Sequence, residues 1–348
     1  MCRAQPGRGT SNLTAEKEKK MEREPTRNLA LDLVRVTEAA ALAAGRFMGR
    51  GKKEAADKAA VDAMRLVLNS MDINGVVVIG EGEKDEAPML YNGERVGTGR
   101  TSLEFDLAID PIDGTRPVAD GRSNAIAIVA IAPRGSMFDP GPFLYMNKIA
   151  VGPEAKGVID IEKPIIDNLK AIAKAKQKRL EDLTCIILDR PRHAEMIREM
   201  RTAGVRIRMI SDGDITAAMM TAWPEAGVDA LFGIGGTPEG VIAACAMRVM
   251  DGEIQGKFYA RDDKELKRGL EMGFDFSKIL TTQDLVSSED VFVAATGITT
   301  GDFLQGVRYT GDGAETDSLV MRGLTGTIRQ IKATHRWDKL KRLSAIDY

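Results

Sequence analysis

The pattern of apolar residues predicts helices first and then buried strands in the N-terminal part of the chain. Apolar residues recur every three or four positions over 28–48 and 52–71, which predicts two amphipathic helices. Continuous apolar runs follow at 76–79 and 125–132, and a largely apolar stretch with Asp106 inside it covers 103–109. We predict a buried strand for each, and the uniform apolarity of 76–79 indicates burial on both faces of that strand. This order predicts an α+β unit whose mixed sheet is flanked by helices.

From about residue 160 the pattern alternates between helix and strand. The predicted helices cover 164–178, 192–203, 214–223 and 238–249. The predicted strands between them cover 184–188, 205–210 and 228–232. Such alternation predicts a second α/β unit with a largely parallel sheet. Beyond it, a strand at 291–295 and alternating residues at 307–308 and 325–334 predict an antiparallel ending.

This change of pattern predicts three segments in the chain. Residues 1–24 mix acids and bases around KEKKMEREP without an apolar core, which is typical of a loose tail and not of a signal peptide. Residues 25–160 are expected to form the α+β unit and to carry the candidate metal site. Residues 161–348 are expected to form the α/β unit and to bind the substrate.

The composition narrows the classes of function. Lys and Arg number 49 against 51 Asp and Glu, and aromatic residues make up 5%, so nothing indicates a nucleic acid or a membrane as partner. No apolar run reaches the length of a membrane span. Three scattered cysteines without metal-ligand spacing indicate a reducing compartment, and we expect the cytoplasm.

The clearest candidate chemistry follows the strand predicted over 103–109, where the chain reads DPIDGT. Asp110 and Asp113 place two carboxylates at the end of a strand. Pro111 cannot donate to a central ladder, so we expect the chain to leave the sheet there. Gly114 and Thr115 suit a tight turn into a helix. Carboxylates beside free backbone N–H groups suit a divalent cation and a phosphate, although an ordinary turn explains these residues about equally well.

Three further acids stand at the ends of predicted elements. Asp57 lies in the second helix, Glu81 follows the first strand, and Glu239 begins a helix after the glycine-rich run GIGGTPEG. Strand ends that face the same way bring such residues together at one edge of a sheet. Each acid alone is more often simply solvated, but jointly they indicate a cation site.

Two polar motifs follow the strands of the second unit. In DRPRH, Arg190 and Arg192 flank a proline and are suited to hold a phosphate, although a solvated strand exit would look the same. In SDGD, Asp212 and Asp214 can accept hydrogen bonds from sugar hydroxyls or cap the following helix. Tyr145 and Lys148 can add donors, but packing of the Tyr145 ring is the simpler explanation for that residue.

Taken together, these motifs resemble the class II fructose-1,6-bisphosphatases of the lithium-sensitive, metal-dependent sugar and inositol phosphatase superfamily. The segments that carry the resemblance are EAADKAAVDAM at 54–64, VIGEGEKDEAPMLY at 78–91, DPIDGT, YMNKIAVGPEAKG at 145–157, DRPRH, SDGD and GIGGTPEG. The resemblance covers about residues 25–335 and implies a layered α-β-α-β-α fold. Relatives in some phototrophs also act on sedoheptulose-1,7-bisphosphate.

The resemblance also implies roles for individual residues. The implied ligands of Mn²⁺ or Mg²⁺ are Asp57, Glu81, Asp110, Asp113 and Glu239. The implied substrate contacts are Asp113, Gly114, Thr115, Tyr145, Arg190, Arg192, Asp212, Gly213, Asp214 and Gly236. The expected catalytic residues are Thr115, which would position the attacking water, Asp85, which would orient Thr115, and Lys53, which stands where the family carries a basic residue. Asp113 departs from the family, whose members often carry Glu there, and this leaves the number and positions of the metal ions open.

The expected activity is hydrolysis of the 1-phosphate of fructose-1,6-bisphosphate in gluconeogenesis, with sedoheptulose-1,7-bisphosphate as a further substrate and a homodimer or homotetramer as the assembly. An inositol or nucleotide monophosphatase is the nearest alternative, and the paired arginines argue against it. A non-catalytic sugar-phosphate sensor would keep DRPRH and GIGGTPEG without needing every acid. A nucleotide-binding oxidoreductase lacks its glycine fingerprint.

Overall fold

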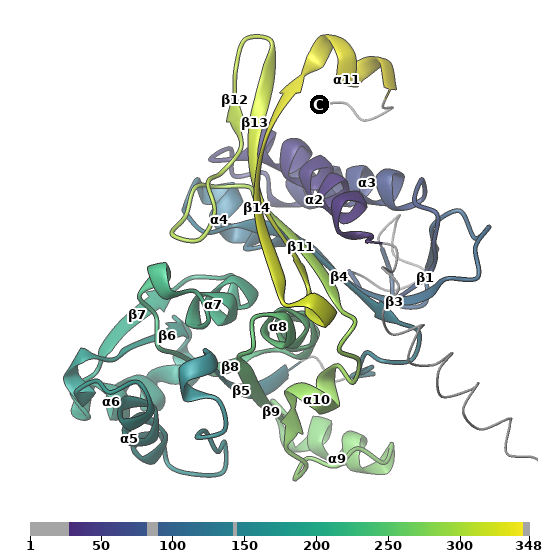
Figure 1. Cartoon of the computed structure of the whole chain (residues 1–348). Helices are drawn as coiled ribbons and strands as arrows, with labels where there is room; N and C mark the ends of the chain where they lie inside the picture. The colour runs from purple at the N-terminus through teal and green to yellow at the C-terminus, as the bar shows by residue number, and fades with distance from the viewer. Residues whose placement is uncertain (1–27, 82–89, 142–144, 344–348) are drawn as a thin grey trace, which may run out of the picture.

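The computed structural model describes residues 28–81, 90–141 and 145–343, and these residues fold into five layers. Figure 1 shows α2 and α3 above a first sheet, α7 and α8 below that sheet, then a second sheet, and finally α5 and α6. The described α-helices are α2 (Ala30–Ala44), α3 (Lys53–Leu68), α4 (Thr115–Asp120), α5 (Ile165–Ala175), α6 (Ala194–Thr202), α7 (Asp214–Thr221), α8 (Thr237–Val249), α9 (Asp263–Glu271), α10 (Thr282–Leu285) and α11 (Trp337–Leu343). This arrangement is consistent with the expected layered α-β-α-β-α fold.

The first sheet is mixed, as the sequence predicts. Its strand order is β12-β13-β11-β4-β3-β1-β2, and β14 pairs with β13 off this path. The strands are β1 (Asn74–Ile79), β2 (Arg95–Val96), β3 (Glu104–Asp113), β4 (Ile126–Pro133), β11 (Phe292–Gly297), β12 (Arg308–Tyr309), β13 (Gly313–Arg322) and β14 (Thr327–Arg336). Strands β1 and β3 pair in parallel, whereas the other strand pairs described in this sheet are antiparallel.

The second sheet is also mixed, so the expectation of a largely parallel sheet is wrong. Its order is β10-β9-β5-β8-β6-β7. The strands are β5 (Tyr145–Val151), β6 (Thr184–Leu188), β7 (Arg206–Ile210), β8 (Ala230–Gly236), β9 (Glu253–Phe258) and β10 (Leu280–Thr281). Strand β6 pairs in parallel with β7 and β8, but β5 is inserted between β8 and β9 and is antiparallel to both. The sequence did not predict β5 because Asn147 and Lys148 interrupt its apolar pattern.

Three large apolar cores lie between the layers, and the central core reaches from the first sheet through α7 and α8 to the second sheet. In β4, Ala127 and Val129 pack toward α2 and α3, while Ile128 and Ala130 pack toward α8 and the second sheet. The third core lies between the second sheet and helices α5 and α6. Because β4 contributes to cores on both sides, its continuous apolar run follows directly from burial on both faces.

The sheets divide the chain differently from the boundary expected after residue 160. Strand β5 lies before that boundary but belongs to the second sheet, and strands β11 to β14 lie after it but extend the first sheet. The sequence of an apolar strand does not indicate which sheet the strand joins, because a strand buried on both faces has the same apolar pattern in either sheet. The expected tail, residues 1–24, lies outside the described residues.

Strand β3 does not leave the sheet at Pro111 but continues to Asp113. Its parallel pairing with β1 ends at Ala108, and its pairing with β4 shifts register between Asp110 and Asp113. Pro111 lies within this irregularity, so its missing N–H removes no ladder hydrogen bond. Helix α4 then begins at Thr115, as expected, after Gly114 with a φ of 105°.

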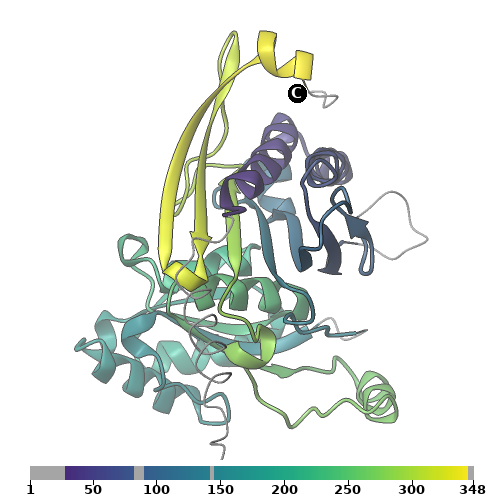
Figure 2. The same cartoon turned by 45° about the vertical axis from the view of Figure 1, so that its right-hand side comes forward.

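The antiparallel ending predicted at the C-terminus is confirmed. Strands β13 and β14 pair along ten residues, and Figures 1 and 2 show their ribbon reaching past α2 to α11. Strand β13 was not predicted because the acids and hydroxyls of GAETDSLVMR obscure its apolar residues. Within the described part of the chain, no helix has both the length and the apolar character needed to cross a membrane.

Candidate active site

The strands β1 and β3 bring two of the candidate acids together. Ile79 pairs with Ala108 in the parallel register, and Glu81 and Asp110 each follow two residues later. The two carboxylates therefore emerge side by side. Burial raises the pKa of Glu81 to about 7, and the charges of Asp57 and Glu239 add to this rise. Burial also raises the pKa of Asp110 well above its ordinary value, followed by the charges of Asp113, Glu81 and Glu239.

Two helices add the remaining acids of this group. Burial raises the pKa of Asp57 in α3, while a hydrogen bond with Thr115 and the charge of Lys53 oppose the rise. Burial raises the pKa of Glu239 in the first turn of α8 to about 7, together with the charge of Asp214. Because these carboxylates perturb one another, the structure brings Asp57, Glu81, Asp110 and Glu239 into one electrostatic cluster.

Asp113 connects this cluster to α7. Its Oδ2 atom accepts hydrogen bonds from the backbone N–H and the hydroxyl group of Thr216, each at 2.8 Å. Burial nevertheless raises its pKa to about 8, followed in effect by the charge of Asp214. A Cβ atom built on Gly213 would lie 3.6 Å from Asp113 Oδ2, so the SDGD motif packs directly against the DPIDGT motif.

The donor set of the cluster suits a hard divalent cation. The Oδ1 atom of Asp57 is buried without a hydrogen-bond partner, and the neighbouring carboxylates raise each other's pKa when no positive charge separates them. Oxygen ligands with surplus negative charge are those that Mg²⁺ and Mn²⁺ prefer. Among the described residues, however, no three His, Cys, Asp or Glu side chains already converge at metal-ligand spacing. The residues nevertheless supply the oxygen ligands and the uncompensated negative charge that such a cation site needs.

The DRPRH motif directly follows β6 in the second sheet. His193 is buried and accepts a hydrogen bond from Ile234 N at 2.8 Å through Nε2, so its Nδ1 carries the proton and donates to Leu188 O at 2.7 Å. Burial lowers the pKa of His193, in agreement with a neutral ring. Arg192 donates to Ile234 O from Nε at 3.1 Å and from Nη2 at 2.7 Å, and its guanidinium lies 5.4 Å from the centre of the Tyr145 ring.

The SDGD motif and the end of β8 carry the other residues that were expected to contact substrate. Arg190 Nη2 lies 3.8 Å from Asp212 Oδ1. Tyr145 pairs with Gly236 across β5 and β8. A Cβ atom on Gly236 would lie 1.6 Å from Glu239 Oε2, which shows how closely the carboxylate folds back on this turn. The expected substrate residues therefore lie along one edge, next to the acidic cluster.

The structure describes one of the two remaining expected catalytic residues, Lys53, but not the other, Asp85. Lys53, at the start of α3, is exposed and lowers the pKa of both Asp57 and Glu81 by its charge, so it lies beside the cluster. Asp85 lies outside the described residues, and its expected role with Thr115 stays a prediction.

The site also contains Thr216 and Thr237, which the sequence did not single out, and Lys148, which it indicated only as a further donor. Thr216 fixes Asp113, and Lys148 donates to Asp214 Oδ2 at 2.6 Å and to Gly236 O at 2.8 Å. The hydroxyl of Thr237 at the start of α8 is buried without a partner in the described structure. Lys148 had a visible signal, since a charged residue in the middle of an otherwise apolar strand must find a buried partner.

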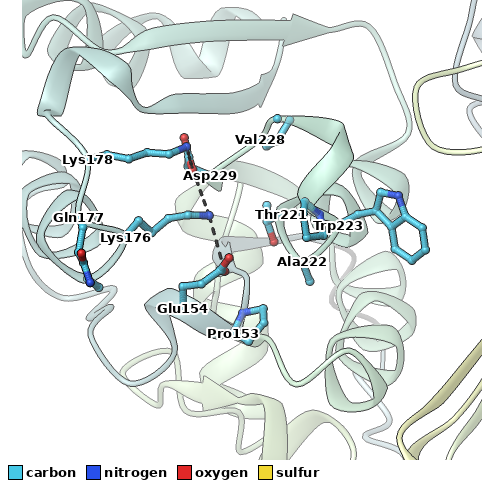
Figure 3. A pocket seen from close by; sticks show the side chains of 13 residues that line it. Pro153, Glu154, Lys176, Gln177, Lys178, Thr221, Ala222, Trp223, Val228 and Asp229 are labelled. Atoms are coloured by element: carbon cyan, nitrogen blue, oxygen red, sulfur yellow. Dashed lines mark hydrogen bonds and ion pairs between the residues drawn. The ribbon is translucent and has the colours of Figure 1, made fainter.

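A separate cavity of about 330 Å³ lies at the opposite end of β8 and α7 (Figure 3). Lys176 and Lys178 reach Asp229 there at 3.0 and 2.6 Å, and Lys176 lies 3.7 Å from Glu154. The two lysines and the two acids neutralise one another. These ion pairs connect the end of α5 to the start of β8 and are not part of the candidate site.

The five layers, with buried carboxylates at strand ends in the middle, define a molecule of the layered phosphatase type. The family model described as bacterial fructose-1,6-bisphosphatase, glpX-encoded, matches residues 27–335, and the chain belongs to this family of hydrolases. The family is in general metal-dependent.

Curated relatives agree with the family match. The chain is 47% identical over 326 residues to the "Fructose-1,6-bisphosphatase 1 class 2" of Escherichia coli strain K12, and the match covers 90% of this chain and 96% of that protein. It is equally similar to the "Fructose-1,6-bisphosphatase class 2" of Shigella flexneri. Among solved structures, an extragenic suppressor from Pyrococcus furiosus matches with 14% identity over 60% of this chain and 70% of that chain, and its TM-score of 0.26 is too low to support an argument.

Proposed function

We propose that this protein hydrolyses the 1-phosphate of fructose-1,6-bisphosphate to give fructose 6-phosphate and phosphate. The observation that carries the proposal is that the adjacent ends of β1 and β3 bring Glu81 and Asp110 together, with Asp57 and Glu239 near enough for their charges to raise the pKa of Glu81. Class II fructose-1,6-bisphosphatases are named for this activity, and the chain matches them along most of its length.

The acidic cluster would hold Mn²⁺ or Mg²⁺ as the cofactor. Asp57, Glu81, Asp110, Asp113 and Glu239 supply the oxygen ligands, with Asp57 Oδ1 as an acceptor that has no other partner. A bound divalent cation supplies a water of lowered pKa and neutralises charge on the phosphate and the leaving oxygen. Thr115, whose side chain is hydrogen-bonded to Asp57, would position that water for attack.

The remaining residues would bind the two phosphates and the sugar of the substrate. Backbone N–H groups at Gly114 and Thr115, where α4 begins, would donate to the reacting phosphate. Arg190 and Arg192 hold the distant phosphate, and Asp212 and Asp214 accept hydrogen bonds from sugar hydroxyls. Binding energy at the distant phosphate then orients the ester for in-line attack.

Phosphate release from a panel of substrates tests the proposal. Purified protein with Mn²⁺ or Mg²⁺ is given fructose-1,6-bisphosphate, sedoheptulose-1,7-bisphosphate, inositol 1-phosphate and a nucleoside monophosphate in parallel. We expect turnover of the bisphosphates and little of the monophosphates, because the two arginines have no partner in a monophosphate. Preferred turnover of inositol 1-phosphate would favour the monophosphatase alternative, and binding without turnover would favour a sensor.

The cellular setting follows from the same proposal. Production of fructose 6-phosphate belongs to gluconeogenesis, and a small-molecule bisphosphate is the expected partner. We further propose cytoplasmic location, because both described cysteines are buried free thiols, and a homodimer or homotetramer as the assembly. Fractionation of cells and light scattering of the purified protein test these two points.

A further inference from the structure

A buried lysine in β5 has no role in the mechanism above. Lys148 is 2% exposed, and its neighbours on the same face of β5, Met146 and Ala150, pack into the central core beside α7 and α8. Its Nζ atom donates to Asp214 Oδ2 at 2.6 Å and to the carbonyl oxygen of Gly236 at 2.8 Å. A buried ammonium group is costly and persists only where it is paired, so both contacts matter for its presence.

Both partners of Lys148 belong to the edge that we propose for substrate binding. Asp214 is the first residue of α7 and its side chain is 9% exposed. Gly236 is the last residue of β8 and pairs with Tyr145 at the start of β5. One ammonium group therefore links α7, β8 and β5 at the point where these three elements meet the candidate site.

The surrounding chain leaves this pair little freedom. A Cβ atom on Gly235 would lie 2.0 Å from Asp214 Oδ2 and 2.9 Å from Lys148 Cε. The ion pair thus occupies the space that a side chain at position 235 would need. An apolar pair of similar size would stabilise the fold at least as well as a buried ion pair, so stability alone does not explain charged groups at this position.

We propose that Lys148 is a positioning residue that holds the carboxylate of Asp214 in place to accept a hydrogen bond from a hydroxyl group of the bound sugar. This inference rests on the proposed function. With Oδ2 bonded to Lys148, the plane of the carboxylate is fixed and Oδ1 is directed as the acceptor for the ligand. The same ammonium group fixes the carbonyl of Gly236, and with it the turn that carries the substrate edge of β8.

The chain provides a matched control at the other end of β8. Asp229 is 1% exposed and pairs with Lys176, whose side chain is 11% exposed, at 3.0 Å (Figure 3). Asp229 also accepts a hydrogen bond from Thr184 N at 2.9 Å. This second lysine–aspartate pair lies far along the strand from the candidate site, so it serves the fold without contacting substrate.

The first test compares Lys148→Met with Lys176→Met in assays with fructose-1,6-bisphosphate. We expect Lys148→Met to raise KM by about tenfold or more, with a smaller fall in kcat, because a charge-assisted contact that orients a binding group is lost. Lys176→Met is expected to lower the unfolding temperature but to leave KM within about twofold, since its pair touches no substrate. Equal effects of the two variants on KM, or an unchanged KM in Lys148→Met, would overturn the proposal.

The second test asks whether Lys148 acts through Asp214. Calorimetry measures the affinity for fructose 6-phosphate in Lys148→Met, Asp214→Asn and the double variant. We expect the double variant to bind about as weakly as Asp214→Asn alone. Losses that multiply would show that Lys148 acts independently of Asp214 and would reject the proposal. If Lys148→Met does not fold, Lys148→Gln replaces it with the same expected outcome.

This cycle also separates the two proposals from each other. A wild-type protein that binds fructose 6-phosphate but releases no phosphate from the bisphosphate would reject the proposed hydrolysis, whereas the binding cycle would still decide the role of Lys148.

Discussion

At the scale of single residues, the site depends on carboxylates held where their charges conflict. Asp110 is the clearest case, because burial and three neighbouring acids all raise its pKa. We predict that Asp110→Asn lowers kcat by at least about 100-fold, the order seen when one group that stabilises transition-state charge is removed. The unfolding temperature of the metal-free variant should not fall, since the substitution removes repulsion. Steady-state kinetics and calorimetry check both parts, and near-normal turnover would refute the metal role of Asp110.

The role of Arg192 is also testable at this scale. Two of its nitrogen atoms are fixed on Ile234 O, so its guanidinium is held in one orientation beside Tyr145. We predict that Arg192→Ala raises KM for fructose-1,6-bisphosphate by about tenfold or more, but much less for a substrate with one phosphate. Lys178→Met, in the distant ion cluster, is the control and should leave both KM values unchanged. Equal losses on the two substrates would reject the anchor for the second phosphate.

At the scale of elements, the turn from β8 into α8 positions Glu239. The side chain folds back over Gly236, where a Cβ atom would lie only 1.6 Å from Glu239 Oε2. We predict that Gly236→Ala displaces this carboxylate and weakens Mn²⁺ binding by about tenfold or more, as disturbed ligand orientation commonly does. Gly311→Ala is the matched control, because an added methyl group there meets nothing within 4 Å. Equal Mn²⁺ affinity of the two variants, measured by calorimetry, would contradict this geometry.

Some elements of the fold could be predicted from the sequence and others could not. The buried strand β4 and the start of α4 at Thr115 follow from local apolar runs and turn residues. The insertion of β5 between β8 and β9 does not follow from the local sequence, because strand pairing depends on residues that are distant in the chain. In addition, a lysine such as Lys148 normally indicates an exposed position, although here it is buried. For the site, strand ends predicted that Glu81 and Asp110 meet, whereas the bond between Thr216 and Asp113 depends on how α7 packs across the layers.

At the scale of the whole molecule, the acidic cluster couples stability to pH and metal. Burial raises the pKa of Glu81 and Glu239 to about 7 and that of Asp113 to about 8, from ordinary values of 4.5 and 3.8. The folded protein therefore binds more protons than the unfolded chain in this window, and its stability falls as pH rises through it. Metal ions bind the deprotonated groups, so the stabilisation that they give grows as pH rises.

This coupling gives a prediction for calorimetry. The unfolding temperature of the metal-free protein is expected to be lower at pH 8 than at pH 6, and the increase caused by Mn²⁺ is expected to be larger at pH 8. The metal-free Asp113→Asn variant should lose part of this pH dependence. An increase with Mn²⁺ that is the same at both pH values would argue against a cation site formed by these acids.

The most direct measurement is phosphate release from fructose-1,6-bisphosphate by protein stripped of metal with EDTA and then titrated with Mn²⁺ or Mg²⁺. The account predicts no turnover by the stripped protein, recovery as metal is added, and no recovery in Asp110→Asn at the same metal concentrations. Full turnover by the stripped protein, or equal recovery in the variant, would contradict the claim that these converging carboxylates form the catalytic cation site.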